Sequence, residues 1–99
     1  MSGGNGAMAL VRALAASGPA FTLVEVESRD WSSATFTGER HRVHVEMADD
    51  AATTAWLAAL PELELTVRGR LVADLAVTDA TRASGRTLAT VEALTICSD

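Results

Sequence analysis

The segment Arg40-His41-Arg42-Val43-His44-Val45-Glu46-Met47 carries the clearest periodic pattern in the sequence. Apolar residues alternate with charged ones along it, and a β-strand points successive side chains to opposite faces. The segment therefore predicts a strand with one face in the core and the other in solvent. The inward row is expected to hold His41, Val43, Val45 and Met47, and the outward row Arg40, Arg42, His44 and Glu46.

The rest of the chain divides into helical and extended segments around this strand. Apolar residues recur at helical spacing over residues 7–17, and again from the capping pair Asp49-Asp50 to Pro61. Turns are expected at Arg29-Asp30 and Gly38-Glu39, and a long polar loop at residues 79–86. The remaining segments predict strands at residues 20–28, 31–37, 63–67, 71–77 and 87–97.

These elements give the order αβββαβββ and predict an α+β fold of two layers. Two helices would cover one face of an antiparallel sheet of five or six strands. Residues 1–6 are expected to be a disordered leader, and residues 7–99 a single domain. The halves 7–47 and 49–97 align loosely, with Ala34–Phe36 against Ala73–Leu75 for example. Internal duplication and a chance match of two amphipathic patterns both account for this similarity.

Composition limits the classes of function. A chain of 99 residues has room for one small domain, and its formal charge of −5 opposes nucleic-acid binding. The single cysteine, Cys97, cannot build a disulfide framework, and the sequence contains neither a secretory signal nor a membrane span. A cytoplasmic protein is expected. No glycine-rich phosphate loop is present, so no nucleotide or other cofactor is expected.

Catalytic and metal-binding patterns are weak. Ser32, Ser33, His41 and Asp30 supply the residue types of a triad without any sequence signature of one, so no catalytic residue is assigned. His41 and His44 point to opposite faces of the strand and cannot share a metal ion, and His44 with Glu46 makes only two ligands. No metal site is therefore assigned, and His41 is interpreted as a core histidine with one hydrogen bond.

The outward row of Arg40, Arg42 and His44 is the candidate ligand-binding surface. Arginines at alternate strand positions can hold a carboxylate or phosphate group through charge-assisted hydrogen bonds. The competing and favoured interpretation is that these arginines pair with Glu25 or Glu27 on a neighbouring strand.

The two tryptophans have different expected environments. Trp56 shares a helical face with Leu60 and is assigned to the core. Trp31 begins a predicted strand beside a turn, so it is the candidate anchor of a protein interface.

The stretch Trp31–Arg42, which reads WSSATFTGERHR, resembles a segment of small uncharacterised bacterial proteins of about 100 residues. The resemblance covers about an eighth of the chain and implies no activity and no site residue.

Three functions follow from this reading. The leading hypothesis is a small homo-oligomeric binding or interaction module, a dimer formed through uncovered sheet surface or an open strand edge. The alternatives are a domain that binds a small anionic ligand, with simple acid–base chemistry, and a structural subunit of a larger complex.

Overall fold

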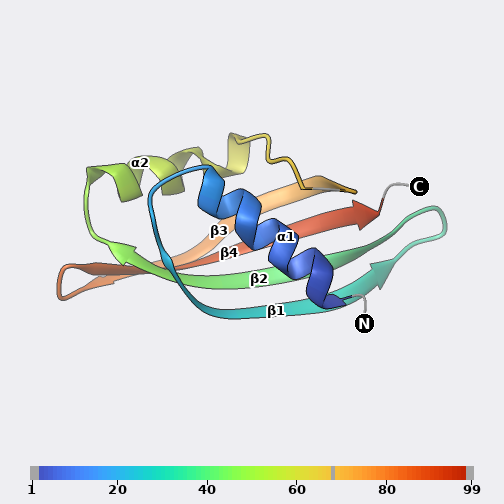
Figure 1. The fold of residues 1–99 in the computed structure, drawn as a ribbon, viewed down its shortest axis with the longest axis horizontal. Helices are drawn as coiled ribbons and strands as arrows, with labels where there is room; N and C mark the ends of the chain where they lie inside the picture. The colour runs from blue at the N-terminus through green and yellow to red at the C-terminus, as the bar shows by residue number, and fades with distance from the viewer. Residues whose placement is uncertain (1–2, 68, 98–99) are drawn as a thin grey trace.

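The computed structural model describes residues 3–67 and 69–97 and forms an α+β fold with one antiparallel sheet (Figure 1). The four strands lie side by side in the order β1-β2-β4-β3. The elements in chain order are α1 (Gly3–Ala16), β1 (Thr22–Ser32), β2 (Thr37–Ala48), α2 (Ala51–Ala59), the short 3-10 helix η1 (Leu60–Glu62), β3 (Arg70–Ala83) and β4 (Arg86–Cys97).

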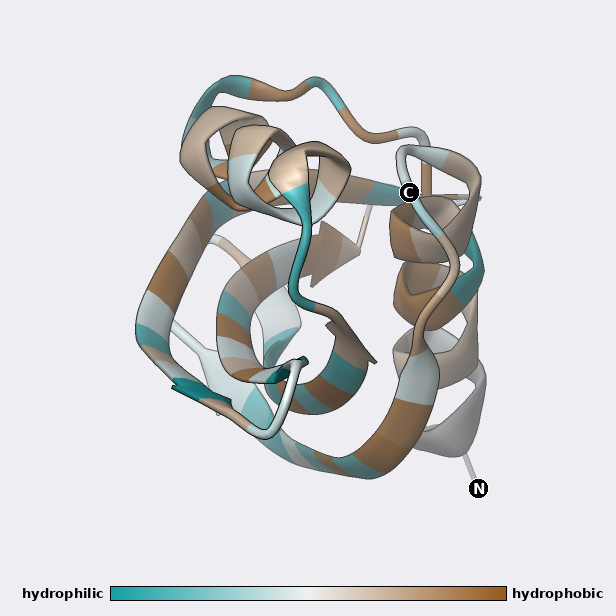
Figure 2. Cartoon of the chain, turned by 90° about the vertical axis from the view of Figure 1, so that its left-hand side faces the viewer, coloured by the Kyte–Doolittle hydropathy of each residue, from teal (hydrophilic) through white to brown (hydrophobic). Residues whose placement is uncertain are grey.

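Both helices lie on the same side of the sheet, as the expected two-layer arrangement requires. Figure 1 shows α1 crossing over β1 and β2, whereas α2 lies towards β3 and β4. In the perpendicular view of Figure 2 the sheet curves around the helices, and hydrophobic and hydrophilic residues alternate along its strands. We call the helix-covered side the inner face and the opposite side the outer face.

The predicted number of five or six strands is wrong, because the described chain has four. Arg29 and Asp30, expected in a turn, belong to one continuous β1 and pair with Arg40 and Glu39 of β2. The turn forms instead at Ser33–Phe36, where the Phe36 amide donates to Ser33 Oγ at 3.1 Å and the Ser33 amide donates to the Phe36 carbonyl at 2.8 Å. Local side-chain capping at Ser33 thus ends the strand, rather than the polar pair before it.

The predicted strand at residues 63–67 joins no ladder, since Val67 makes only an isolated bridge to Arg70. The predicted loop at residues 79–86 is also wrong, because β3 continues to Ala83 and returns through Ser84-Gly85. Both turn residues have positive φ, 54° and 74°, as the two-residue turns that match strand twist require. Because the turn is this tight, β3 and β4 pair along residues 79–83 and 86–90, although the polar sequence at residues 79–86 resembles a loop.

The element order αββαββ repeats one unit along the chain. One pair of segments aligned from the sequence does not follow that repeat, since Ala34–Phe36 lies in the first hairpin's turn and Ala73–Leu75 lies within β3. Helix α1 begins at Gly3, so residues 3–6 of the expected leader form its first turn, and Met1 and Ser2 lie outside the described residues.

The core lies between the inner face and the helices. Val43, Val45 and Val91 of the central strands are fully buried. They pack in one cluster with Leu10 and Leu14 of α1, and the cluster also includes Met47, Trp56, Leu60, Val67, Leu75, Ala89 and Ala93. Burial of these side chains is the main favourable contribution to folding.

Trp56 connects α2 to the segment that leaves α1, and its assignment to the core is confirmed. Its side chain is 5% exposed, stacks on Phe21 with ring centroids 5.9 Å apart, and donates Nε1–H to Ser17 Oγ at 2.8 Å. Gly18 lies against the indole so closely that a Cβ there would collide with Cδ1 of the ring. The helix layer therefore depends on a residue without a side chain at position 18.

We predict that Gly18→Ala lowers the free energy of unfolding by about 1–3 kcal/mol, the usual cost of overpacking a filled site. Urea denaturation measures this cost. In a Trp56→Leu background the same substitution is expected to cost much less, because the colliding indole is gone. Equal costs in the two backgrounds would contradict the proposed contact.

Candidate functional site

The outer face is organised by the strand register into rows that cross all four strands. Side chains of one row on adjacent strands are direct cross-strand neighbours and can interact. Each row has a distinct chemical character. From the Trp31 end they are an apolar row of Trp31, Gly38, Ile96 and Leu71; an arginine row of Arg29, Arg40, Leu94 and Asp74; a mixed row of Glu27, Arg42, Glu92 and Ala76; and a histidine row of Glu25, His44, Thr90 and Asp79.

An open depression of about 250 Å³ lies among the arginines, and we call it the arginine pocket. Its lining consists of Glu27, Arg29, Arg40, His41, Arg42 and Glu92. Two of the three predicted ligand residues, Arg40 and Arg42, therefore lie together as expected. The third arginine, Arg29, is not among the predicted ligand residues, because the sequence places it in a turn.

The arginines of the pocket differ in their partners. Arg42 Nε lies 3.1 Å from Glu92 Oε2 on β4, so the expected pairing with Glu25 or Glu27 of β1 is wrong for this residue. Arg29 and Arg40 stand opposite each other across β1 and β2. Among residues 3–67 and 69–97, neither of these two guanidinium groups forms an ion pair with a carboxylate. Two positive charges thus face each other without an ion pair to either, although Glu27 and Glu92 line the same pocket.

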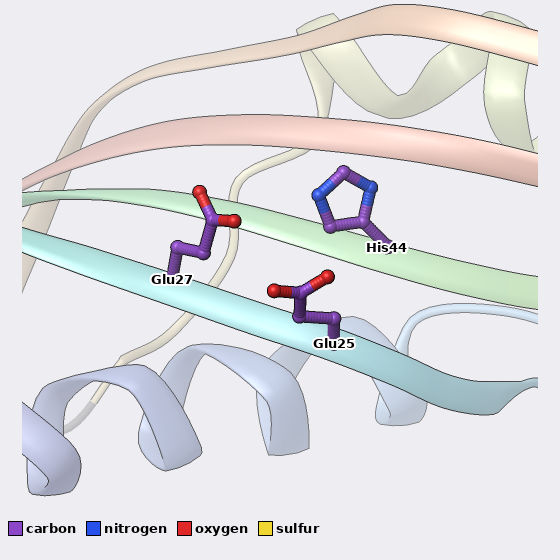
Figure 3. Close-up of side chains that lie close together, drawn as sticks. All are labelled: Glu25, Glu27 and His44. Atoms are coloured by element: carbon purple, nitrogen blue, oxygen red, sulfur yellow. The ribbon is translucent and has the colours of Figure 1, made fainter.

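His44, the third predicted ligand residue, lies away from the arginine pocket. Figure 3 shows its ring over β2, with the side chains of Glu25 and Glu27 extending towards it from β1, and one ligand atom from each of the three residues lies within 4.8 Å of the others. Glu46, the metal ligand considered with His44, instead accepts from Arg86 Nε at 3.2 Å. Glu25 and Glu27 of β1 thus place two carboxylates beside His44, in addition to the residues that the sequence of β2 alone provides.

A buried polar cluster occupies the inner face behind the arginine pocket. His41 is 2% exposed and lies between Ser28 Oγ, 2.7 Å from Nδ1, and Thr95 Oγ1, 3.0 Å from Nε2. The Thr95 hydroxyl donates to the Glu39 carbonyl, so it accepts from Nε2–H, and Nδ1 accepts from Ser28. The expected core histidine is confirmed, with two hydrogen bonds instead of one.

Charge surrounds this histidine. Glu39 Oε1 lies 2.9 Å from Arg70 Nη1 and 3.8 Å from His41 Nε2, although no described donor is aligned for a hydrogen bond to that oxygen. Burial, and secondly the positive charge of Arg70, hold the pKa of His41 below its ordinary value of 6.5. The folded protein therefore favours the neutral form of the His41 ring.

We predict that His41 makes the protein less stable in mild acid. Because its pKa is lower in the folded than in the unfolded state, the unfolded chain takes up the proton first as the pH falls below 6.5. This histidine contributes a slope of at most about 1.4 kcal/mol per pH unit to the free energy of unfolding between the unfolded and folded pKa values. Well above pH 6.5, where the unfolded chain also carries a neutral His41, its contribution is constant.

Urea denaturation between pH 5 and 8 measures this slope, and NMR titration of the ring follows His41 itself. His41→Gln is expected to flatten the profile. A profile unchanged by His41→Gln would contradict the assignment.

The predicted interface residue Trp31 is half-buried and lies in the apolar row. At the other end of that row Leu71 is 60% exposed, and Ile96 lies between them beside Gly38. The register thus places Trp31 in the same row as two other apolar side chains, beyond Gly38.

The strand edges carry features that oppose sheet extension. Strand β1 has a bulge between Leu23 and Glu25, and β3 has bulges between Val72 and Asp74 and between Val77 and Asp79. Bulges twist an edge away from regular pairing.

Within the described ranges, no helix combines the length and hydropathy needed to cross a membrane. No protein-family model, curated protein or solved structure matches the chain.

Proposed function

We propose that the protein binds a small anion with two or more negative charges in the arginine pocket. The observation that carries this proposal is the cross-strand pair Arg29 and Arg40, two cations in direct register with no carboxylate partner among the described residues. Like charges placed opposite each other destabilise a sheet. A bound phosphate or carboxylate removes that repulsion and accepts charge-assisted hydrogen bonds from both guanidinium groups.

The pocket favours a compact ligand. Its volume of about 250 Å³ is below the usual range for drug-sized molecules, and Glu27 and Glu92 on its rim oppose an extended polyanion. The chain as a whole has a formal charge of −5 and therefore repels anions. Only the arginines of the pocket attract them, which further favours a small ligand. Binding without chemistry is the simplest function of such a site.

We predict that Arg40→Gln and Arg29→Gln each weaken binding of pyrophosphate or citrate about tenfold or more, because each removes charged hydrogen bonds to the anion. Isothermal titration calorimetry measures the affinity. Arg12→Gln, which removes the same charge at an exposed position of α1, is the matched control. An equal loss in that control would show that net charge, and not the pocket, attracts the anion.

The same variant has an opposite effect on the free protein. Without ligand, Arg40→Gln is expected to raise the free energy of unfolding by a few tenths to about 1 kcal/mol at low salt, since it removes a cross-strand repulsion. High salt should diminish this gain. A variant that binds weakly because it is unfolded would instead be less stable.

The apolar row supports a second candidate function, self-association through the outer face. Trp31, Ile96 and Leu71 lie in one row across the outer face, with Gly38 between Trp31 and Ile96. The twofold symmetry of a homodimer would place two such rows in contact. The bulged edges make this face a better contact than an open strand edge.

We predict that light scattering coupled to size-exclusion chromatography gives twice the chain mass of 10.3 kDa, and that Leu71→Glu returns the protein to a monomer. The exposed Leu88, outside the apolar row, is the control position for the same substitution. A mass of 10.3 kDa at every concentration would overturn the dimer. Recovery of a different protein on the same face would then support the subunit hypothesis.

The repeated αββ order also supports an internal duplication. The sheet order β1-β2-β4-β3 places the second strand of each unit at the centre and the first strand at an edge. Two copies of one unit related by a twofold axis between β2 and β4 would produce that order.

A further inference from the structure

We propose that Glu25, Glu27 and His44 form a binding site for one divalent transition-metal ion of the zinc type. The site lies in the histidine and mixed rows of the outer face, beside the arginine pocket. Metal binding at this site is distinct from anion binding. Glu27 also lines the arginine pocket, whereas Glu25 and His44 do not.

The geometry brings three metal-binding groups to one point. The two glutamates occupy alternate positions of β1 and so share the outer face, and the register places Glu25 directly opposite His44. One donor atom of each side chain lies within 4.8 Å of the other two. Figure 3 shows both carboxylates extending from β1 towards the imidazole ring over β2. Zinc coordination at about 2.0–2.2 Å from each donor requires only small side-chain adjustments from this spacing.

The orientation of His44 is the second observation. Its Nδ1 lies 3.1 Å from Thr90 Oγ1 on β4, which fixes the ring from the side away from the glutamates. The other ring nitrogen faces the two carboxylates (Figure 3). Metal-binding histidines use this arrangement, in which one nitrogen donates to a neighbouring oxygen and the other offers its lone pair to the ion.

The charges around the site favour a cation. Arg42 lies directly opposite Glu27 in the register, yet its guanidinium contacts Glu92 on the other side. Within the described parts of the chain, neither Glu25 nor Glu27 forms an ion pair. Two neighbouring carboxylates repel each other, and a divalent ion neutralises both while the imidazole supplies the third bond.

The donor set selects the metal. One nitrogen and two carboxylate oxygens suit zinc and its transition-metal neighbours, whereas magnesium and calcium prefer oxygen ligands alone. Three protein ligands leave at least one coordination position for water or an anionic ligand.

Zn²⁺ titration by calorimetry, in buffer free of phosphate, tests the proposal. We expect one ion per chain, with Ca²⁺ and Mg²⁺ failing to compete. Glu25→Gln and His44→Gln should each weaken binding at least tenfold. Thr90→Val should weaken it by about 10–100-fold, because the His44 ring loses the hydrogen bond that orients it. NMR should show the His44 ring signals shifting on saturation.

The controls separate this site from other zinc ligands. Glu46→Gln makes the same charge change on the same face and should leave the affinity unchanged, as should Cys97→Ser. Arg40→Gln should also have no effect on Zn²⁺ binding, so this test is independent of anion binding. Absence of binding at millimolar Zn²⁺, equal losses in Glu46→Gln, or loss in Cys97→Ser would each overturn the proposal.

Discussion

The register of β2 between β1 and β4 is the constraint on which the rest of the structure depends. It places Val43 opposite Val91 at the centre of the core, and a slip of one residue would turn every inward side chain of β2 to solvent. The same pairing fixes His41 between Ser28 and Thr95 on the inner face. Core packing therefore determines the arrangement of the outer face, even though few outer side chains contribute to the core.

On that outer face, charge is separated along the strands. Arg29 and Arg40 form a positive pair, and Glu25 and Glu27 a negative pair, in neighbouring rows. Exposed ion pairs contribute little to stability. Pairing these arginines with these glutamates would therefore change the free energy of unfolding very little. Neither pair forms an ion pair among the described residues, and this observation is the basis for proposing external ions as their partners.

The buried cluster on the inner face has a different role. Glu39, His41 and Arg70 come from β2 and β3, and Thr95 comes from β4, so the cluster ties three strands together at one end of the sheet. Buried polar groups are costly unless they are satisfied, and a shifted register would leave these groups without partners. The cluster thus favours one arrangement of the strands and makes stability sensitive to acid.

The sequence by itself determined the α+β class, the two helices, the core role of Trp56 and the alternation of β2, because these follow from local periodicity. It misplaced the hairpin turns, since Arg29-Asp30 resembles a turn yet pairs in the ladder, and β3 runs through polar residues to Ala83. Only the tertiary structure decided that Arg29 joins Arg40 and that His44 joins Glu25 and Glu27. Those groupings depend on cross-strand register, a relation between residues distant in sequence that no local pattern records.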